Sequence, residues 1–490
     1  MYEQEKIRKK KLIKIKLLGI NPYPSKIYKT NYNIKKILIN KKKIIKNNIN
    51  LSINGRILSI RNMSKSSFID IKDYTDNKIQ LFYNIKNINK KLINKEYYIL
   101  LFKKYLDIGD IIWINGKLFL TKVKEYTILI NKIKLLSKCI YPIPNIKIKK
   151  NKIYKKFKNK EKRYRMRYID LLLNKKVKKN FLIRSLIIKY LRNFLNKLNL
   201  IEVDTPILQN IPGGANAKPF ITYHNKFKKY LYLRISNELY LKRLIVGGFK
   251  GVYEFSRNFR NESIDKNHNP EFTILEFYIS YKNYIWMMKL IEKLLKYICK
   301  KTFNKYKIKI NNNIIDFSKK IKKIKLFNII KKYTNLNINE NTSLKELIKK
   351  SKKLKINIKE NENTKEKIID NIFNKYCKKK IKKPLFIIDY PKYMSPLAKS
   401  KIKNKKLTER FELYINGKEI ANAYTELNDP YDQFKRFKKQ NKKFIDKDFI
   451  KSLKIGMPPT VGIGIGIDRL IALFTNNNNI QEIILFPQMK

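Results

Sequence analysis

The chain has 490 residues, of which 43% are hydrophobic, so it is long enough for two or three domains with substantial cores. It carries 113 basic and 38 acidic residues, and the formal net charge of +75 favours a polyanionic partner such as nucleic acid. Because the lysines are spread along the whole chain, much of the excess is equally consistent with codon drift in an AT-rich coding sequence.

Cysteines and apolar runs exclude several classes of protein. The three cysteines, Cys139, Cys299 and Cys377, are far apart and in no paired spacing, which indicates a reducing compartment without a disulfide framework or zinc site. The charged N-terminus lacks the apolar core of a signal peptide, and no apolar run reaches the roughly 18 residues of a membrane span. We therefore expect a cytoplasmic protein with no membrane partner.

The first part of the chain predicts a basic helical extension over 1–48 and a small β-domain over 49–145. Five short alternating apolar runs, at 51–54, 68–71, 79–82, 111–114 and 126–130, are separated by turn residues or charges. Five strands in about 90 residues are typical of a closed barrel of the oligonucleotide-binding (OB) type. Any other small β-domain remains an alternative on this pattern.

A basic connector over 146–176 leads into a second domain at 177–490. This domain begins with an amphipathic helix at about 178–199 and a strand that ends at Pro206. Strand-like runs then alternate with helices, and a lysine-rich helical insertion occupies about 315–382. The last strand, Gly462 to Gly466, has glycine at alternate positions, which allows a ligand or backbone to approach one face closely.

Arginine marks the first candidate site. A guanidinium matches two phosphate oxygens at once and lysine does not, so arginines in this lysine-rich chain suggest a geometric requirement. Arg260 lies close to His268 and Phe272, and Arg469 follows the glycine strand. A structural ion pair is the alternative for any one of them.

Carboxylates mark the second candidate site. Glu412 and Glu419 flank the turn Asn416–Gly417, and in a hairpin they would converge to hold Mg²⁺; two solvated strand-end acids are the alternative. Glu238 and Glu426 would face a cationic substrate, since a desolvated carboxylate left unpaired discriminates against uncharged analogues.

Three segments in order resemble the motifs of class II aminoacyl-tRNA synthetases. They are the 178–206 helix and strand, Phe259–Glu262 with the loop to Phe272, and Gly462–Arg469. Further segments at 211–215, 268–273, 395–399 and 422–426 resemble those of bacterial-type lysyl enzymes. The resemblance implies an α+β protein, with an N-terminal OB-fold β-barrel that binds the anticodon and an antiparallel catalytic sheet flanked by helices.

The resemblance also implies roles for individual residues. The catalytic residues would be Arg260, Arg469 and His268. ATP would be bound by Arg260, Glu262, His268, Asn269, Phe272 and Arg469. Lysine would be bound by Gly214, Glu238, Arg260, Glu276, Tyr278, Asn422, Tyr424, Glu426 and Gly464. The anticodon would be bound by Arg61, Phe68, Gln80 and Glu125, and Mg²⁺ by Glu412 and Glu419.

The implied reaction is attack of the lysine carboxylate on ATP, followed by transfer of lysine to tRNA(Lys), in a cytoplasmic homodimer. A sister ligase for another substrate and a non-catalytic RNA-binding paralogue are the alternatives. The chain departs from the family at Ala421, Ala423, Tyr424 and Ser263. We expect the first two to narrow the pocket, and the hydroxyl of Tyr424 to need a partner.

Overall fold

The computed structural model describes residues 2–63, 66–84, 100, 104–144, 146–149, 152–155, 157–356, 363–440 and 445–489. Two compact units divide the chain, Met1–Lys160 and Glu161–Lys490, and each is described by itself. None of the helices within the described ranges is both long enough and apolar enough to cross a bilayer.

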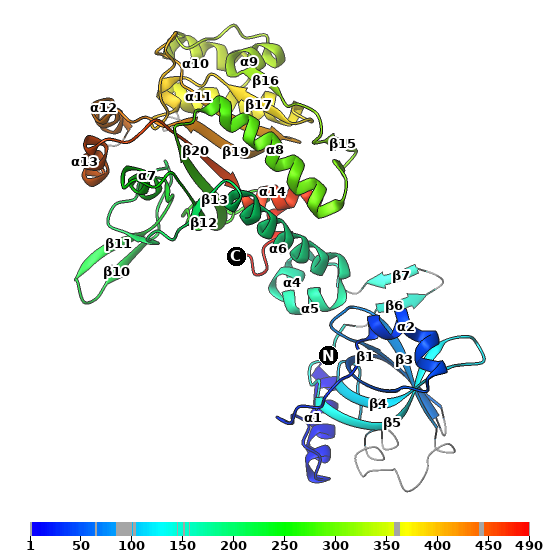
Figure 1. Ribbon diagram of the computed structural model, residues 1–490. Coiled ribbons are helices and arrows are strands. Elements are labelled where there is room, and N and C mark those ends of the chain that lie inside the picture. Colours follow the sequence, from blue (N-terminus) through cyan, green and yellow to red (C-terminus); the bar gives the residue numbers. More distant parts are fainter. Residues whose placement is uncertain are drawn as a thin grey trace. The chain divides into compact units, whose positions relative to one another are not determined.

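The N-terminal unit is a five-stranded closed barrel in the order β1-β2-β3-β5-β4 (Figure 1). Its strands are β1 (Asn50–Asn62), β2 (Ser66–Lys72), β3 (Lys78–Asn84), β4 (Ile111–Leu120) and β5 (Tyr126–Ser137). Alternate residues of each strand point inward and form one apolar core. The five predicted strands and the OB-type barrel are therefore confirmed.

Two helices and a small ribbon complete this unit. Helix α1 (Tyr2–Leu17) and helix α2 (Ile34–Lys46) bury isoleucines against the barrel core, and the side chain of Asn33 caps α2. Strands β6 (Ile146–Lys149) and β7 (Lys152–Lys155) pair only with each other among the described residues.

The C-terminal unit is built on an eight-stranded sheet in the order β16-β17-β18-β19-β20-β13-β12-β8. The strands from β17 to β12 are antiparallel neighbours, and the outer pairs β16/β17 and β12/β8 are parallel. The bounds are β8 (Ile201–Glu202), β12 (Gly251–Phe259), β13 (Glu271–Ser280), β16 (Lys322–Lys325), β17 (Leu385–Ile388), β18 (Arg410–Ile415), β19 (Lys418–Thr425) and β20 (Thr460–Gly466).

Helices cover one face of this sheet and leave the middle of the other face for the site. The covering helices are α6 (Lys175–Asn196), α8 (Tyr284–Phe303) and α14 (Ile467–Phe474), and Figure 1 shows α8 running across the sheet. They pack on the odd-numbered residues of the central strands, such as Phe277, Ala423 and Ile463. The even-numbered residues of β13, β19 and β20 therefore point to the opposite face. Helices α7 (Glu238–Val246) and α13 (Lys447–Ile455) border that face.

Residues 322–356 and 363–389 form a subdomain at the edge of the sheet. It contains helices α9 (Leu326–Thr334), α10 (Leu344–Lys353) and α11 (Lys365–Ile372), and a separate apolar core. The preceding hairpin of β14 (Lys307–Ile310) and β15 (Asn313–Asp316) packs into the main core instead. The expected insertion over about 315–382 is mostly helical, but it also contains β16, which joins the main sheet through β17. The edge strand was missed because Lys322–Lys325 has one apolar residue and no readable alternation.

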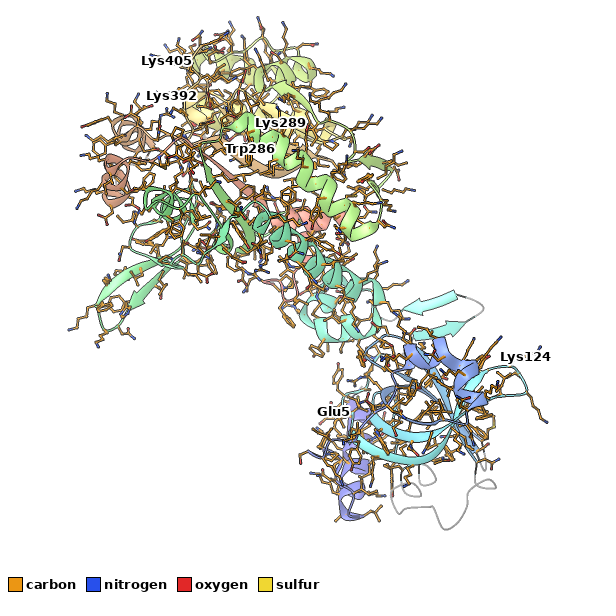
Figure 2. The ribbon with its side chains drawn as sticks, viewed as in Figure 1. Glu5, Lys124, Trp286, Lys289, Lys392 and Lys405 are labelled. Atoms are coloured by element: carbon orange, nitrogen blue, oxygen red, sulfur yellow. The ribbon has the colours of Figure 1, made fainter. Side chains whose placement is uncertain are left out.

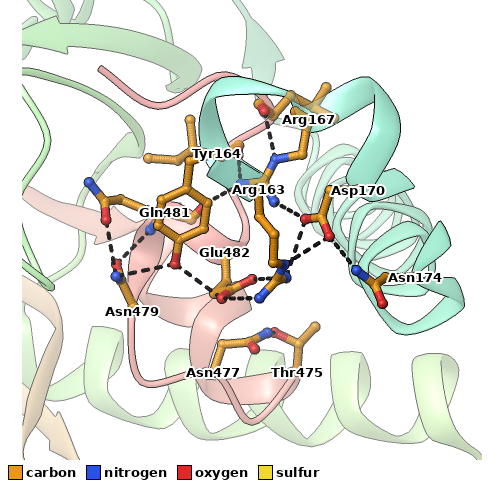
Figure 3. Close-up of polar contacts among 12 residues, drawn as sticks. Arg163, Tyr164, Arg167, Asp170, Asn174, Thr475, Asn477, Asn479, Gln481 and Glu482 are labelled. Carbon is orange, nitrogen blue, oxygen red and sulfur yellow. Dashed lines mark hydrogen bonds and ion pairs between the residues drawn. The ribbon is translucent and has the colours of Figure 1, made fainter. Parts of the chain in front are cut away.

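Residues 161–176, which the sequence analysis assigns to the connector, fold onto the C-terminal unit. Helices α4 (Lys160–Arg165) and α5 (Arg167–Leu173) place Arg163 and Arg167 against the last turn of the chain (Figure 3). The fully buried Arg167 bonds Asp170 at 2.8 Å and donates to the carbonyl oxygens of Gln481 and Leu485 at 2.7 and 2.9 Å. These bonds anchor the 3₁₀ turn η8 (Ile480–Glu482), whose first residue reaches the cavity described next.

Candidate active site

A cavity of about 380 Å³ opens on the uncovered face of the sheet. Strands β13, β19 and β20 form its floor, because their register sets Glu276, Gly464 and Asn422 side by side, and Tyr278, Gly462 and Tyr424 in the next row. The expected residues that line the cavity are Gly214, Glu238, Arg260, Glu262, His268, Asn269, Phe272, Glu276, Tyr278, Glu419, Asn422, Tyr424, Gly464 and Arg469. The structure thus brings together residues from 214 to 469.

Glycine makes room for the floor side chains. A Cβ on Gly462 would lie 2.2 Å from Glu426 Oε1 and 2.3 Å from the Tyr278 ring. Any side chain there would displace the carboxylate or the ring, so close approach requires glycine at position 462. Gly214, in a loop with φ of +82°, brings its backbone close to Ser236 on the cavity wall.

The open end of the cavity is cationic and aromatic. The Arg260 guanidinium lies 5.1 Å from the Phe272 ring centroid, and its buried Nε has no hydrogen-bond partner among the described residues. Arg469 donates to Glu419 Oε2 at 3.3 Å and lies 3.3 Å from His268 Nε2. An unsatisfied guanidinium donor beside a second arginine forms a site for an anion.

The His268 and Asn269 side chains are held by the loop before β13. His268 Nδ1 lies 3.0 Å from the Asp265 carboxylate, which orients the ring with Nε2 toward Arg469. Asn269 is buried and donates to the Glu271 carbonyl at 2.8 Å, while its Oδ1 has no partner within the described part of the chain. Glu262 is exposed at the rim.

The closed end of the cavity is acidic. Burial, reinforced by the nearby Glu238 carboxylate, raises the pKa of Glu276 to about 8. Tyr278 donates to Glu276 at 3.2 Å, and Tyr424 donates to Glu238 Oε1 at 2.7 Å. The Tyr424 hydroxyl therefore has its expected partner. A site with several desolvated carboxylates suits a ligand that carries ammonium groups.

Glu426 lies behind this end rather than on the cavity surface. It is 1% exposed, and its Oε1 is packed against Gly462, which does line the cavity. Burial, with the Glu238 and Glu276 carboxylates, raises its pKa well above the usual range, and Lys242 opposes that rise. Lys242 was not expected from the sequence, since a lysine inside an amphipathic helix is usually solvent-facing.

The two carboxylates expected to bind Mg²⁺ differ in their surroundings. Glu419 lines the cavity and is 32% exposed. Glu412 is buried: Arg410 bonds its Oε1 at 2.5 Å, and the hydroxyls of Tyr390 and Tyr414 bond its Oε2 at 2.7 and 2.8 Å. Within the described residues no group of three or more His, Cys, Asp or Glu is placed to hold a metal. Of the two carboxylates, only that of Glu419 is therefore open to the cavity.

The alanines that replace glycine both lie on the covered face of the sheet. Ala421 and Ala423 pack in the same core, and Ala421 also borders the cavity. The narrowing of the pocket expected from the two methyl groups therefore stays a prediction. Ser263 lies in the lining of the open end.

In the barrel, three of the four expected anticodon residues, Arg61, Phe68 and Gln80, lie on the outer face of β1, β2 and β3. Arg61 pairs with Phe68 across β1 and β2, and its guanidinium carbon lies 5.8 Å from the Phe68 ring centroid. Gln80 on β3 accepts from Thr127 at 2.9 Å, and Glu125 is exposed at the start of β5. The sequence analysis missed Phe82, whose ring lies 4.7 Å from that of Phe68.

Comparison with known proteins agrees with this geometry. Residues 159–490 match the model of the family described as "tRNA synthetases class II (D, K and N)", and residues 51–136 match that of the "OB-fold nucleic acid binding domain". The C-terminal unit is thus a class II synthetase domain, as the sequence motifs predicted.

Full-length relatives narrow the class. The lysine–tRNA ligase of Azobacteroides pseudotrichonymphae is 47% identical over 508 residues, covering 100% of this chain and 99% of that protein. That of Porphyromonas gingivalis strain W83 is 45% identical over 501 residues, covering 100% of this chain and 86% of that protein. That of Wigglesworthia glossinidia brevipalpis is 44% identical over 496 residues, covering 99% and 97%. The chain belongs to the lysine–tRNA ligase family of class II synthetases.

Proposed function

We propose that the protein is a lysine–tRNA ligase that activates lysine with ATP and transfers it to tRNA(Lys). The observation that carries this proposal is the polarity of one cavity, with Arg260 and Arg469 at one end and Glu238 and Glu276 at the other. Such a cavity orients a substrate with a carboxylate at one end and ammonium groups at the other. The acidic end disfavours aspartate, the substrate of a sister ligase.

The reaction has two displacements. The lysine carboxylate attacks the α-phosphorus of ATP, the bond to the β-phosphate oxygen breaks, and pyrophosphate leaves. A hydroxyl of the terminal ribose of tRNA then attacks the lysyl carbonyl carbon, and AMP leaves. Neither step requires a covalent bond to the protein, so the residues act by positioning and charge stabilisation.

The residues at the open end are proposed to bind ATP. Arg260 would contact the α-phosphate and the lysine carboxylate through donors that include its unpartnered Nε. Phe272 would stack on adenine, with Arg469 on the other face and His268 on the phosphates. Glu262 and Asn269 would also contact the bound ATP.

The residues at the closed end are proposed to bind lysine. Glu426 and Tyr278 would receive the side-chain ammonium, and Glu238 would lie near the α-amino group. Glu276, Asn422 and Tyr424 would complete the polar wall, while Gly214 and Gly464 shape it.

Magnesium is proposed to join the site on the phosphates of ATP. Glu419 would hold it, and Glu412 would contribute only by exchanging the hydrogen bonds it now accepts. The ion, when bound, would supply positive charge that offsets the charge of the phosphates.

The barrel is proposed to bind the anticodon through Arg61, Phe68, Gln80 and Glu125. A stacked ring with neighbouring polar groups is the usual arrangement for holding a splayed base. We also propose that the barrel spans about 49–145 and the catalytic domain about 177–490, with the remaining segments as extension and connector.

A homodimer is proposed because apolar side chains remain exposed around the first motif. Five such side chains on β8, β9 (Leu208–Gln209), β10 (Ile221–His224) and β11 (Lys229–Leu233) are 47 to 67% exposed, namely Ile201, Leu208, Ile221, Tyr223 and Tyr230. Such a concentration is typical of a subunit interface. With free thiols at all three cysteines, we place the enzyme in the cytoplasm.

The test is ATP–pyrophosphate exchange with each of the twenty amino acids, without tRNA. Stimulation by lysine alone, followed by charging of tRNA with a lysine anticodon, is the expected outcome. If no amino acid stimulates exchange while the protein binds tRNA, an RNA-binding role without catalysis replaces the proposal.

A further inference from the structure

The lysine pocket contains a lysine of the protein itself. Lys242 lies on α7, one turn after Glu238, and its side chain is 0% exposed. Its Nζ lies 2.5 Å from Glu238 Oε1 and contacts Glu426 Oε2 directly. The ammonium therefore joins the two carboxylates that are proposed to receive the ammonium groups of the substrate, and the reaction described above gives it no part.

The surroundings of Lys242 are otherwise apolar or aromatic. Its Nζ lies 5.6 Å from the Tyr424 ring centroid and 5.9 Å from that of Phe449, within a cluster that includes Leu241 and Leu453. A desolvated ammonium is costly without paired carboxylates. Although burial lowers it, the Glu238 and Glu426 carboxylates hold the pKa of Lys242 above its ordinary value.

Lys242 also opposes the rise in the pKa of Glu426. The charged or titratable side chains that face Glu426 are Lys242, Glu238, Glu276, Tyr278 and Tyr424. Of these, Lys242 is the cation, and it lowers the pKa of Glu426 against burial and the two other carboxylates. Glu426 Oε1 meanwhile has no hydrogen-bond partner among the described residues and lies against Gly462 on the cavity wall.

The bonds to Glu238 are arranged in a similar way. Lys242 and the Tyr424 hydroxyl both bond Oε1, at 2.5 and 2.7 Å, while Glu238 itself lines the cavity. Lys242 therefore contacts one oxygen of each carboxylate and links Glu238 on the cavity wall to Glu426 behind it.

We propose that Lys242 is a positioning residue for the amino-acid substrate, which holds the carboxylates of Glu238 and Glu426 in place at the acidic end of the cavity. The inference rests on the proposed function and deepens it. A merely structural lysine would affect stability alone, and a lysine that competes with the substrate would weaken binding.

The test compares Lys242→Met with a matched control, Lys138→Met. Lys138 in the barrel is also 0% exposed and bridges two carboxylates, 2.5 Å from Asp107 and 2.8 Å from Asp110. In pyrophosphate exchange, K242M is expected to raise the KM for lysine about 100-fold, as for loss of one partner of a buried charge pair, with little change in the KM for ATP. K138M is expected to leave both KM values unchanged.

The dependence of the KM for lysine on pH distinguishes a positioning role of Lys242 from a merely structural one. Removing Lys242 takes away the interaction that lowers the pKa of Glu426, so Glu426 should ionise at a higher pH in K242M than in the wild type. The ratio of the K242M to the wild-type KM for lysine should therefore fall as the pH rises toward the pKa of Glu426 in the variant. In the double variant K242M/E426Q, which also removes the unpaired buried carboxylate and so guards against misfolding, the ratio should stay high and lose its pH dependence.

Three results would overturn the proposal. They are a K242M variant with the lysine KM of K138M, a K242M variant with a lower lysine KM than wild type, and a ratio that does not change with pH. Failure of the wild-type protein to respond to lysine would instead reject the proposed function.

Discussion

At the scale of single residues, Arg260 offers the sharpest test of anion binding. Its Nε is buried without a partner among the described residues, so the side chain is set to donate to a ligand. Arg260→Gln is expected to lower the rate of pyrophosphate exchange by about 10²–10³-fold, as for removal of one preorganised donor. The control is Arg257→Gln, since Arg257 lies three residues away but is exposed and outside the cavity. Equal losses in both variants would reject the assignment.

Glu276 makes a second prediction at this scale. Its pKa is about 8 in the folded protein, above the ordinary 4.5, so the folded state binds a proton that the unfolded state releases. Its contribution to stability is therefore fully present below about pH 4.5 and is lost as the pH rises toward 8. In Glu276→Gln this loss should disappear, so thermal unfolding should vary less between pH 6 and 8.5.

The two tryptophans make that measurement specific. Trp113 lies on β4 of the barrel and Trp286 on α8 of the C-terminal unit. In a Trp113→Phe background, fluorescence reports the unit that contains Glu276. Asp370→Asn serves as a comparison, because burial raises the pKa of Asp370 to about 7 and this residue lies outside the cavity lining. This substitution should remove a different part of the dependence of thermal unfolding on pH. An unchanged slope in Glu276→Gln would show that Glu276 is ionised in the folded protein.

At the scale of elements, the barrel predicts a separation of binding from catalysis. Phe68→Ala is expected to weaken tRNA binding by roughly 1–3 kcal/mol, the usual contribution of one stacked base. Lysine-dependent pyrophosphate exchange should not change, because Phe68 belongs to the N-terminal unit and the cavity to the other. A loss of exchange, or full tRNA affinity, would contradict the role given to Phe68.

Elements with strong periodicity were predictable, and sites made by distant segments were not. The five barrel strands and α8 follow alternation and helical spacing, so local sequence suffices for them. Lys242 on α7 meets Glu426, the residue after β19, only in the folded domain, and Glu412 meets Tyr390 only through the β17–β18 pairing. The family resemblance supplied the cavity residues, whereas their internal partners required the structure.

The same contrast explains the missed edge strand. Lys322–Lys325 carries almost no pattern of its own and becomes a strand because β17 offers it hydrogen-bonding partners. Tertiary context overrides weak local preference in such a case.

At the scale of the whole molecule, the net charge of +75 has two possible origins, codon drift and RNA binding. Lys289 and Lys405 on the C-terminal unit and Lys124 on the barrel are exposed, and side chains like them project from both units (Figure 2). If codon drift alone placed the lysines, they are spread too thinly to act together on one RNA. If they act together, they neutralise many phosphates and release the counterions bound to them.

Salt dependence distinguishes these cases. We expect affinity for a non-cognate tRNA to fall by about 10³-fold between 50 and 200 mM salt, as for a protein that contacts six or more phosphates. Charging specificity should rise over the same range, because the contacts of Arg61, Phe68 and Gln80 with bases depend less on salt than the contacts with phosphates. The measurement is a log–log plot of affinity against salt for cognate and non-cognate tRNA. If the slopes for cognate and non-cognate tRNA each correspond to only one or two phosphate contacts, most of the positive charge has no function in RNA binding.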